Sequence, residues 1–240
     1  MDIDLELDPR RLVWALARII LALDAAYVFT QFFVRVLGWS HRNIIFVLFD
    51  LNHEMNLPTL YSGATLLLCA ILLAMSAAGE ARKRRPFFGW AGLSLAFVFL
   101  SADELLVIHE KLNEPLRAAL HTSGGVFHYA WVIPYAIGAA VFAAVYVPFL
   151  LRLPVSTRKL FVLSGLIFVG GAVGCEIVGN LILKSAPPQS VAMGVEILIE
   201  ETMEMGGVAL FLYAIASYMQ AELPGLGLRL SVSAASSEKA

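Results

Sequence analysis

The sequence predicts an all-α integral membrane protein, a polytopic bundle of about six spanning helices with one further interfacial or re-entrant helix between spans 1 and 2. Of its 240 residues, 59% are hydrophobic and 15% are charged, whereas soluble domains have roughly 45–50% and 25%. The mean hydropathy is +0.77. Apolar runs of about 20 residues recur, and a helix of that length crosses a roughly 30 Å hydrocarbon core. These observations exclude an ordinary soluble domain.

Six spans follow from the apolar runs. The first begins after Arg10 and Arg11, and it is too long for the apolar part of a cleaved signal peptide. The predicted spans cover residues 12–37, 58–78, 87–109, 128–151, 160–183 and 196–218. The apolar run from Ile44 to Phe49 is too short to span, so we expect it to lie at the interface or to re-enter the membrane. This segment is a candidate lid.

The chain is expected to form one transmembrane domain, residues 1–220, followed by a disordered cytoplasmic tail, residues 221–240. The tail ends in a polar, low-complexity run, which cannot bury enough apolar surface to fold. Cys69 and Cys175 lie inside apolar runs and form no C-x-x-C pair, so we expect neither a disulfide framework nor a cysteine zinc site. The net charge of -2 gives no sign of a nucleic-acid partner.

The distribution of basic residues predicts the orientation. Under the six-span model most basic residues fall on one side of the membrane, which the positive-inside rule makes the cytoplasmic side. They are Arg10, Arg11, Arg82, Lys83, Arg84, Arg85, Arg152, Arg158 and Lys159. Both termini are then cytoplasmic. By the same model Tyr129 and Trp131 suit the outer interface, and Trp90 and Tyr218 suit the inner one.

Acidic side chains from three spans reach the same depth near the outer face. A charge at mid-span costs roughly 2.5–3.5 kcal/mol on insertion scales, so such residues usually face the bundle interior and often mark function. A lone acid, Asp24 in the first span, is better explained by helix packing. The clustered acids are Asp103 and Glu104 in the third span, Glu176 in the fifth, and Glu200, Glu201 and Glu204 in the sixth.

Helical periodicity groups the acids of the third span. On an uninterrupted helix, Glu110 and Glu114 each project within about 20° of Asp103. Adjacent residues point about 100° apart, so His109 and Glu110 can serve one site only where the helix unwinds. An alternative explanation of His109, Glu110 and Glu114 is a polar helix end before Pro115.

The fifth and sixth spans carry complementary patterns. Gly171, Cys175 and Gly179 form a ridge of small residues on the fifth span, which permits close approach of a neighbouring helix. One stripe of the sixth span consists of Glu196, Glu200, Glu204 and Gly207. The sixth span, like the third, therefore directs acids toward a neighbour.

Carboxylates this dense cannot all remain ionised without a counter-charge, because like charges a few ångströms apart oppose each other's ionisation. Either a metal ion supplies the positive charge, with His109 as a nitrogen ligand and His53 as a further candidate, or several acids are protonated and relay protons. Carboxylates with one or two histidines are the ligands of di-iron and di-manganese centres in helix bundles. Those centres use Glu-x-x-His, which is absent here, so a mononuclear site with Ser101 nearby stays open.

Four segments resemble a family of uncharacterised bacterial multi-pass inner-membrane proteins. They are Phe49 to Thr59 (FDLNHEMNLPT), Ser101 to Glu110 (SADE followed by IHE), Trp131 to Pro134 and Glu200 to Gly206 (EETMEMG). The resemblance implies a bacterial inner-membrane location but no activity. It also implies that Glu54 joins the acid cluster and that His53 is not a fixed ligand.

Three functions follow from this pattern. The first is a metal-dependent membrane enzyme, an oxidoreductase or hydrolase at the periplasmic side, which binds Fe, Mn or Zn and acts on a lipid or a small periplasmic molecule. The second is a proton- or cation-coupled transporter or channel, and the third is a non-catalytic scaffold. For the enzyme, the catalytic residues would be Glu54, Asp103 and Glu104, and the metal ligands His109, Glu110, Glu176, Glu200, Glu201 and Glu204.

Overall fold

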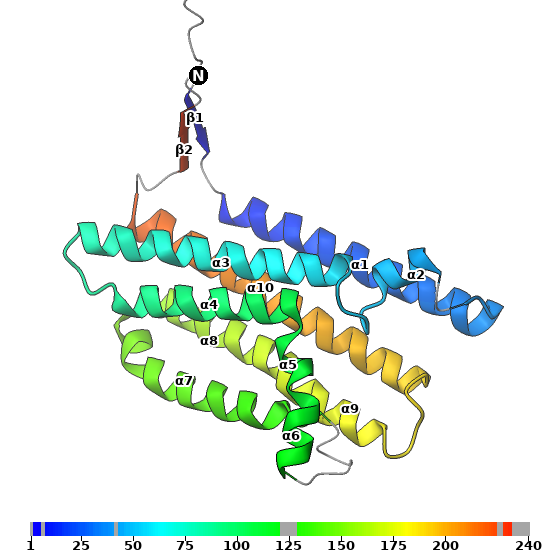
Figure 1. Ribbon diagram of the computed structural model, residues 1–240. Coiled ribbons are helices and arrows are strands. Elements are labelled where there is room, and N and C mark those ends of the chain that lie inside the picture. Colours follow the sequence, from blue (N-terminus) through cyan, green and yellow to red (C-terminus); the bar gives the residue numbers. More distant parts are fainter. Residues whose placement is uncertain (1, 6–7, 41–42, 121–128, 225–227, 232–240) are drawn as a thin grey trace, which may run out of the picture.

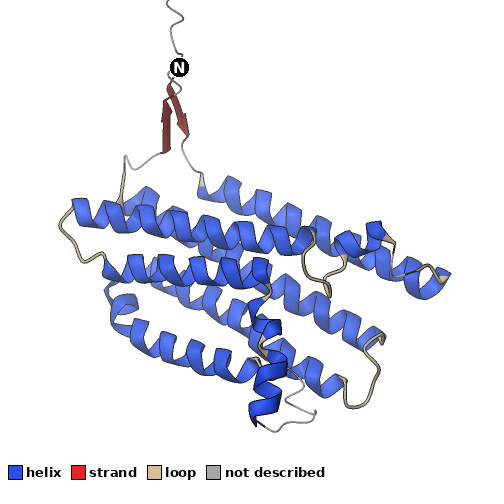
Figure 2. Ribbon diagram, in the orientation of Figure 1, coloured by secondary structure: helices blue, strands red, loops and turns tan. Residues whose placement is uncertain are grey.

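The computed structural model describes residues 2–5, 8–40, 43–120, 129–224 and 228–231. Within these ranges it contains six helices long and apolar enough to cross a membrane, which confirms the predicted helical bundle (Figure 2). The elements are β1 Asp2–Leu5, α1 Pro9–Leu37, α2 Ile44–Phe49, α3 Leu57–Arg82, α4 Phe88–Leu106, α5 Ile108–Lys111, α6 Asn113–Leu120, α7 Val132–Arg152, α8 Val155–Val169, the π-helix η2 Gly170–Cys175, α9 Glu176–Ile182, α10 Val191–Glu222 and β2 Leu228–Ser231. The fifth span runs through α8, η2 and α9.

The central helix of the bundle is α10, which packs against α1, α3, α8 and η2 (Figure 1). The helices α3 and α4 form an antiparallel pair beside it. By contrast, α7 lies at the edge, and Val132 is its one buried residue. Side chains on α7 therefore face outward along most of the helix.

The core is made by close packing of aliphatic and aromatic side chains. Leu72 of α3 meets the fully buried Leu212 and Ile215 of α10 in one apolar cluster. Trp90, 2% exposed, packs edge-on against Phe149 with ring centroids 5.3 Å apart. Trp90 and Tyr218 are buried between helices, and their expected location at the inner membrane interface stays a prediction. Their packing contributes van der Waals contact, which drives helix association in lipid.

The connection between α2 and α3 is organised by the buried Asn56. Its side-chain nitrogen donates to the carbonyls of Val47 (3.2 Å) and Asp50 (2.7 Å), and its side-chain oxygen accepts from the backbone N–H of Thr59 (3.2 Å). The last of these caps the start of α3, where Pro58 follows in the first turn. One side chain therefore ties the short helix α2 to the third helix and fixes the chain between them.

Two predicted spans are interrupted near the same level. The third span was expected to continue to residue 109, but α4 ends at Leu106 and Val107 adopts a left-handed conformation with φ of 54°. The fifth span, expected to be continuous, widens into the π-helix η2 around a glycine-rich GGAVGC sequence. Such π-helical segments occur often at functional sites.

The two ends of the chain meet in a short antiparallel ribbon, in which Asp2 of β1 lies opposite Ser231 of β2. Figure 2 shows this ribbon standing away from the helices. The predicted disordered tail falls largely on residues 225–227 and 232–240, which lie outside the described residues. Its start differs from the expectation, because α10 continues to Glu222.

Candidate functional site

A cavity of about 140 Å³ lies where the interrupted spans meet. We call it the acid cavity, because its lining contains eight carboxyl groups and one imidazole, and no lysine or arginine is among the described residues that line it. All nine predicted site residues line it: Glu54, Asp103, Glu104, His109, Glu110, Glu176, Glu200, Glu201 and Glu204. Their common location is therefore established by the structure, whereas their roles as ligands or catalysts stay predictions.

Asp103 is the best-satisfied acid of the cavity. Its Oδ1 accepts from the backbone N–H of His109 (2.9 Å) and from the hydroxyl of Tyr135 (2.8 Å), and its Oδ2 lies 3.3 Å from His109 Nδ1. A carboxylate is an acceptor only, so His109 donates through Nδ1 and keeps Nε2 as an acceptor. Asp103 therefore orients the His109 ring rather than offering free oxygens to a ligand.

The break at Val107 explains how His109 and Glu110 reach the same cavity. A continuous helix would point them about 100° apart, but the left-handed Val107 turns the chain into the one-turn helix α5, and both side chains line the cavity. A β-branched residue with positive φ is strained, and such strain persists where surrounding contacts hold it. The prediction that Glu114 shares a helix face with Asp103 and Glu110 is wrong, because Glu114 lies beyond the break and pairs with Arg117 (3.5 Å).

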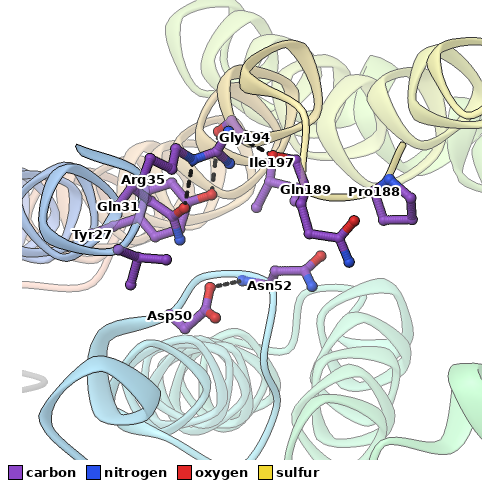
Figure 3. A pocket seen from close by; sticks show the side chains of 10 residues that line it. Tyr27, Gln31, Arg35, Asp50, Asn52, Pro188, Gln189, Gly194 and Ile197 are labelled. Carbon is purple, nitrogen blue, oxygen red and sulfur yellow. Dashed lines mark hydrogen bonds between the residues drawn. The ribbon is translucent and has the colours of Figure 1, made fainter. Parts of the chain in front are cut away.

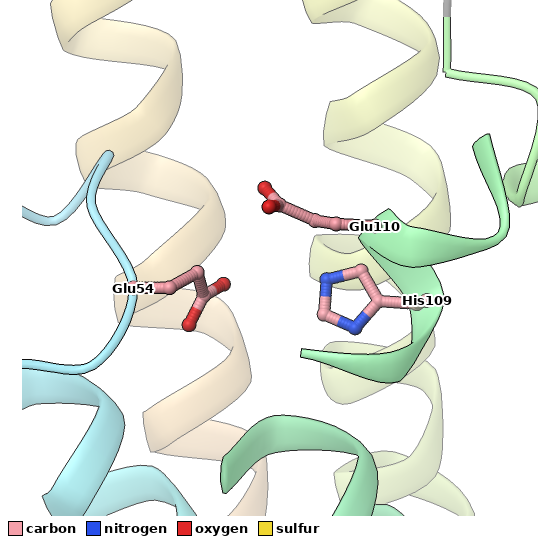
Figure 4. A group of neighbouring side chains, drawn as sticks. All are labelled: Glu54, His109 and Glu110. Carbon is pink, nitrogen blue, oxygen red and sulfur yellow. The ribbon is translucent and has the colours of Figure 1, made fainter. Parts of the chain in front are cut away.

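Among the described residues, Glu54, His109 and Glu110 form the one group of ligand-type atoms close enough together to hold a metal ion. One such atom from each residue lies within 4.8 Å of the others. Figure 4 shows the two carboxylates and the imidazole facing a common space from the α2–α3 connection and from α5. Glu54 is held in place by Thr59, whose hydroxyl donates to Glu54 Oε2 (3.1 Å). The arrangement has the composition of a small metal site with oxygen and nitrogen ligands.

The surroundings shift the titration of the groups in the connecting segments. Burial raises the pKa of Glu54, although the nearby His109 opposes the shift. Burial lowers the pKa of His109, but the hydrogen bond and the charge of Asp103 outweigh it, so the net shift is upward. Burial raises the pKa of Tyr129 to about 12, which keeps its phenol neutral. Glu54 and His109 thus both hold a proton more readily than in water.

The opposite wall of the cavity depends on close helix contact. The carboxyl groups of Glu176 and Glu200 lie within hydrogen-bonding reach of each other, so at this contact they must share a proton or a cation. At Gly171 a Cβ would lie 2.9 Å from the Glu200 carbonyl oxygen and 3.0 Å from Glu204 Cγ. The small-residue ridge predicted on the fifth span is therefore confirmed at Gly171, which lets η2 approach α10.

Two acids near the cavity are buried with unpaired oxygens. Asp24 accepts a hydrogen bond from Thr202 (3.2 Å) through Oδ2, while its Oδ1 has no partner among the described residues. Both carboxyl oxygens of Glu196 are also buried without a hydrogen-bond partner among the described residues, and this carboxyl group lies against Gly179. The acidic character of this end of the bundle therefore extends beyond the cavity itself.

Aromatic residues before and within α7 complete the site, and sequence periodicity did not identify them. Trp131 is 8% exposed and packs on the His109 ring with centroids 4.8 Å apart, and its expected level at the outer interface stays a prediction. Tyr129 and Tyr135 line the cavity as well. The Trp131 to Pro134 segment in the family resemblance was the one signal that could have pointed to this wall.

Comparison with known proteins gives one match. A family model described as "Domain of unknown function (DUF8692)" matches residues 13–218, a range that includes every residue of the acid cavity. No curated protein and no solved structure matches the chain. The expected resemblance to an uncharacterised family is confirmed to this extent, and the bacterial inner membrane stays a prediction.

Proposed function

The chain belongs to the family described as Domain of unknown function (DUF8692), and because that description carries no activity, we propose a function from the cavity itself. The protein is a metal-dependent membrane enzyme, with a divalent transition metal (Fe, Mn or Zn) held in the acid cavity. The observation that carries this proposal is the lining of eight carboxyl groups and one histidine with no lysine or arginine among the described residues.

Charge balance requires a cation or several bound protons at this place. Two unit charges 4 Å apart interact by about 4 kcal/mol at an effective dielectric constant of 20, so ionised carboxylates in one small cavity repel strongly. The surrounding helices supply no permanent cation to the cavity lining in the described chain. A divalent ion compensates two of these charges at once, which is why carboxylate-rich bundle sites commonly hold metals.

The orientation of His109 favours a metal over protons alone. Metal-binding histidines usually donate their second ring nitrogen to a carboxylate, which fixes the tautomer and the ring direction. Asp103 makes that contact with Nδ1 at 3.3 Å, and Nε2 is left for a ligand. Glu54 and Glu110 offer carboxylate oxygens within 4.8 Å in the same group. We assign these three residues as the core ligands and Asp103 as the positioning residue.

The remaining carboxylates have two roles in this proposal. Glu176, Glu200 and Glu204 complete the coordination or hold a second ion, as acids on facing helices do in dinuclear bundle centres. Glu104 and Glu201 act as proton acceptors for the substrate. Bound in the cavity, a transition metal would supply Lewis-acid or redox chemistry, which corresponds to a hydrolase or an oxidoreductase.

The positive-inside rule supports a location on the periplasmic side of a bacterial inner membrane. The cavity is formed by the end of α4 and the start of α10, whereas the cluster Arg82, Lys83, Arg84 and Arg85 follows α3 at the other end. In this orientation both termini are cytoplasmic, and substrates reach the cavity from the periplasm or the outer leaflet.

Metal analysis of purified full-length protein tests the proposal. We expect close to one or more equivalents of a transition metal in wild type, and a loss of at least about tenfold in the Glu54→Gln/His109→Ala double variant. Glu80→Gln, at a buried acid remote from the cavity, serves as the matched control and keeps its metal. The proposal fails when folded wild type, reloaded with Fe, Mn and Zn in turn, retains only trace metal.

A gradient measurement separates the enzyme from a transporter. In proteoliposomes, the proposal predicts no flux of protons or sodium that depends on a proton or sodium gradient. Gradient-dependent flux that is lost in Glu201→Gln would instead identify the cavity as the ion site of a transporter.

A further inference from the structure

A second and larger cavity, of about 310 Å³, adjoins the acid cavity. It lies between α1, the connection after α2, and the start of α10, and we call it the Arg35 pocket (Figure 3). Asn52 and Ile197 line both cavities. A molecule held in the Arg35 pocket would therefore lie beside the acid cavity.

The guanidinium of Arg35 is fixed in this pocket without a counter-charge in contact. Its Nε donates to Gln31 Oε1 (3.0 Å), and its Nη1 donates to the backbone carbonyl of Gln189 (2.9 Å). Among the ion pairs of the described residues, none includes Arg35. At Gly194 a Cβ would lie 2.7 Å from Nη2, so the guanidinium rests directly against α10 at this glycine. Arginine cannot lose its proton in proteins, and the positive charge is therefore permanent.

Neutral donors accompany the guanidinium. Gln31 uses its side-chain oxygen to accept from Arg35, which leaves its amide NH2 as a donor. The amides of Asn52 and Gln189 also line the pocket, and Figure 3 places Asn52 on the wall opposite Arg35. Donors on both walls suit a ligand with several acceptor oxygens, and guanidinium groups match phosphate geometry well.

One acid limits the charge that the pocket accepts. Asp50 lines the wall that carries Asn52, and its Oδ1 accepts from the backbone N–H of that residue (3.1 Å). Its negative charge partly offsets the positive charge of Arg35, so a singly charged phosphodiester fits better than a doubly charged phosphate.

We propose that the Arg35 pocket binds the phosphodiester group of the substrate that reacts at the acid cavity. The pocket as a phosphodiester site stands on its own geometry, and its link to a reaction rests on the proposed function. The same chemistry is presented by a phospholipid headgroup and by a soluble phosphodiester, and the choice of probes below distinguishes the two.

Calorimetric titration of the purified full-length protein in detergent tests this site. The probes are dihexanoyl phosphatidylglycerol and glycerophosphoglycerol, which share one phosphodiester and differ in their acyl chains. We expect Arg35→Gln to weaken binding of the preferred probe by at least about tenfold, the loss of one charge-assisted contact. Arg117→Gln, which changes an arginine that lines neither cavity, leaves binding unchanged. Asp50→Asn strengthens it.

Several results would overturn the assignment. They are the absence of binding of either probe to wild type at millimolar concentration, equal binding by Arg35→Gln and wild type, and loss of binding in His109→Ala, which would place the phosphate on a metal. Tighter binding of the dihexanoyl probe identifies a lipid headgroup as the source. Equal binding of the two probes identifies a soluble phosphodiester.

The metal content of the same samples separates the two proposals. Arg35→Gln keeps its metal when both are correct. Metal-free wild type that still binds the probe through Arg35 would uphold the pocket and reject the metal enzyme. A metal-loaded protein that binds the probe equally well with and without Arg35 would uphold the metal enzyme and reject the pocket.

Discussion

The two ends of the bundle differ in whether their buried acids have lysine or arginine side chains as partners. At one end Glu80, 4% exposed, accepts a hydrogen bond from the hydroxyl of Tyr218 (2.8 Å) and lies 3.8 Å from Arg85. Arg85 also pairs with Glu222 (3.3 Å), and Lys83 donates to the backbone carbonyl of Glu222. At the other end, the eight carboxyl groups of the acid cavity have one imidazole and no lysine or arginine in the described lining.

The difference shows which buried acids receive their hydrogen-bond donors and counter-charges from the protein itself. Glu80 has a donor and a cation from neighbouring segments, so its role is explained by helix packing and by the charge balance at that end. The described lining of the acid cavity contains no lysine or arginine, so its carboxyl groups depend on bound protons, a bound ion or the His109 ring for charge balance. Burial of an acid alone therefore does not identify a binding site, whereas a cavity that gathers eight carboxyl groups with no lysine or arginine in its described lining points to one.

The largest expected effect is at Asp103, whose two carboxyl oxygens contact the backbone N–H and the ring of His109 and the hydroxyl of Tyr135. Asp103→Asn replaces an acceptor of the His109 ring with an amide, which no longer fixes Nε2 toward the cavity. Loss of such a supporting contact lowers metal affinity by about 10–100-fold, and competition with a metal-binding dye measures it. Glu80→Gln is the matched substitution at the other end and leaves the affinity unchanged. Equal affinities of Asp103→Asn and wild type would remove Asp103 from the site.

The pH dependence of stability should distinguish the metal-free and metal-loaded states. The upward pKa shifts of Glu54 and His109 mean that the folded protein binds protons more tightly than the unfolded chain. Their contribution to stability is therefore full below the unfolded pKa values, 4.5 for Glu54 and 6.5 for His109, and it is lost as the pH rises through the folded values.

We expect the metal-free protein to melt at a higher temperature at pH 6 than at pH 8. Metal binding displaces these protons, so metal affinity and the metal-induced rise in Tm should both be larger at pH 8. Thermal unfolding in detergent with and without metal measures both trends. In His109→Ala the pH dependence of the metal-free protein should flatten, and an unchanged slope would show that other groups cause it.

The smallest expected effect is at the compensated end. Tyr218→Phe removes the donor to Glu80 and should lower the free energy of unfolding by about 1 kcal/mol, the usual value of a hydrogen bond. Metal content should stay at the wild-type level. A loss of metal in Tyr218→Phe would mean that the two ends are coupled and that the contrast between them is not local.

The sequence was sufficient for the number of spans and for the location of the acids. Apolar length alone predicts six helices, and depth along each helix brings residues such as Asp103, Glu176 and Glu204 to one level. Placement at one level is enough to form a shared cavity when the helices are neighbours. Glu54 was added by the family resemblance, since no helical pattern includes it, and the structure places it in the lining.

The details of the site depend on a backbone conformation and on tertiary contacts that no residue pattern predicts. Helical periodicity assumes a continuous α-helix, but Val107 leaves that conformation although β-branched residues rarely adopt positive φ. Sequence alone therefore could not show that both His109 and Glu110 face the cavity. In the same way, the pairing of Tyr135 with Asp103 depends on how α7 packs beside α4, which is a tertiary contact.

The turn at Val107 makes the two adjacent side chains proposed as ligands interdependent. His109 and Glu110 are carried by one short segment, and its direction is set by a single backbone conformation and by the contact of the His109 N–H with Asp103. Straightening of α4 into α5 would point His109 and Glu110 about 100° apart, so the two side chains could no longer face the cavity together. Occupancy by an ion would hold the bend closed, so loading and local folding of this corner should occur as one cooperative step rather than ligand by ligand.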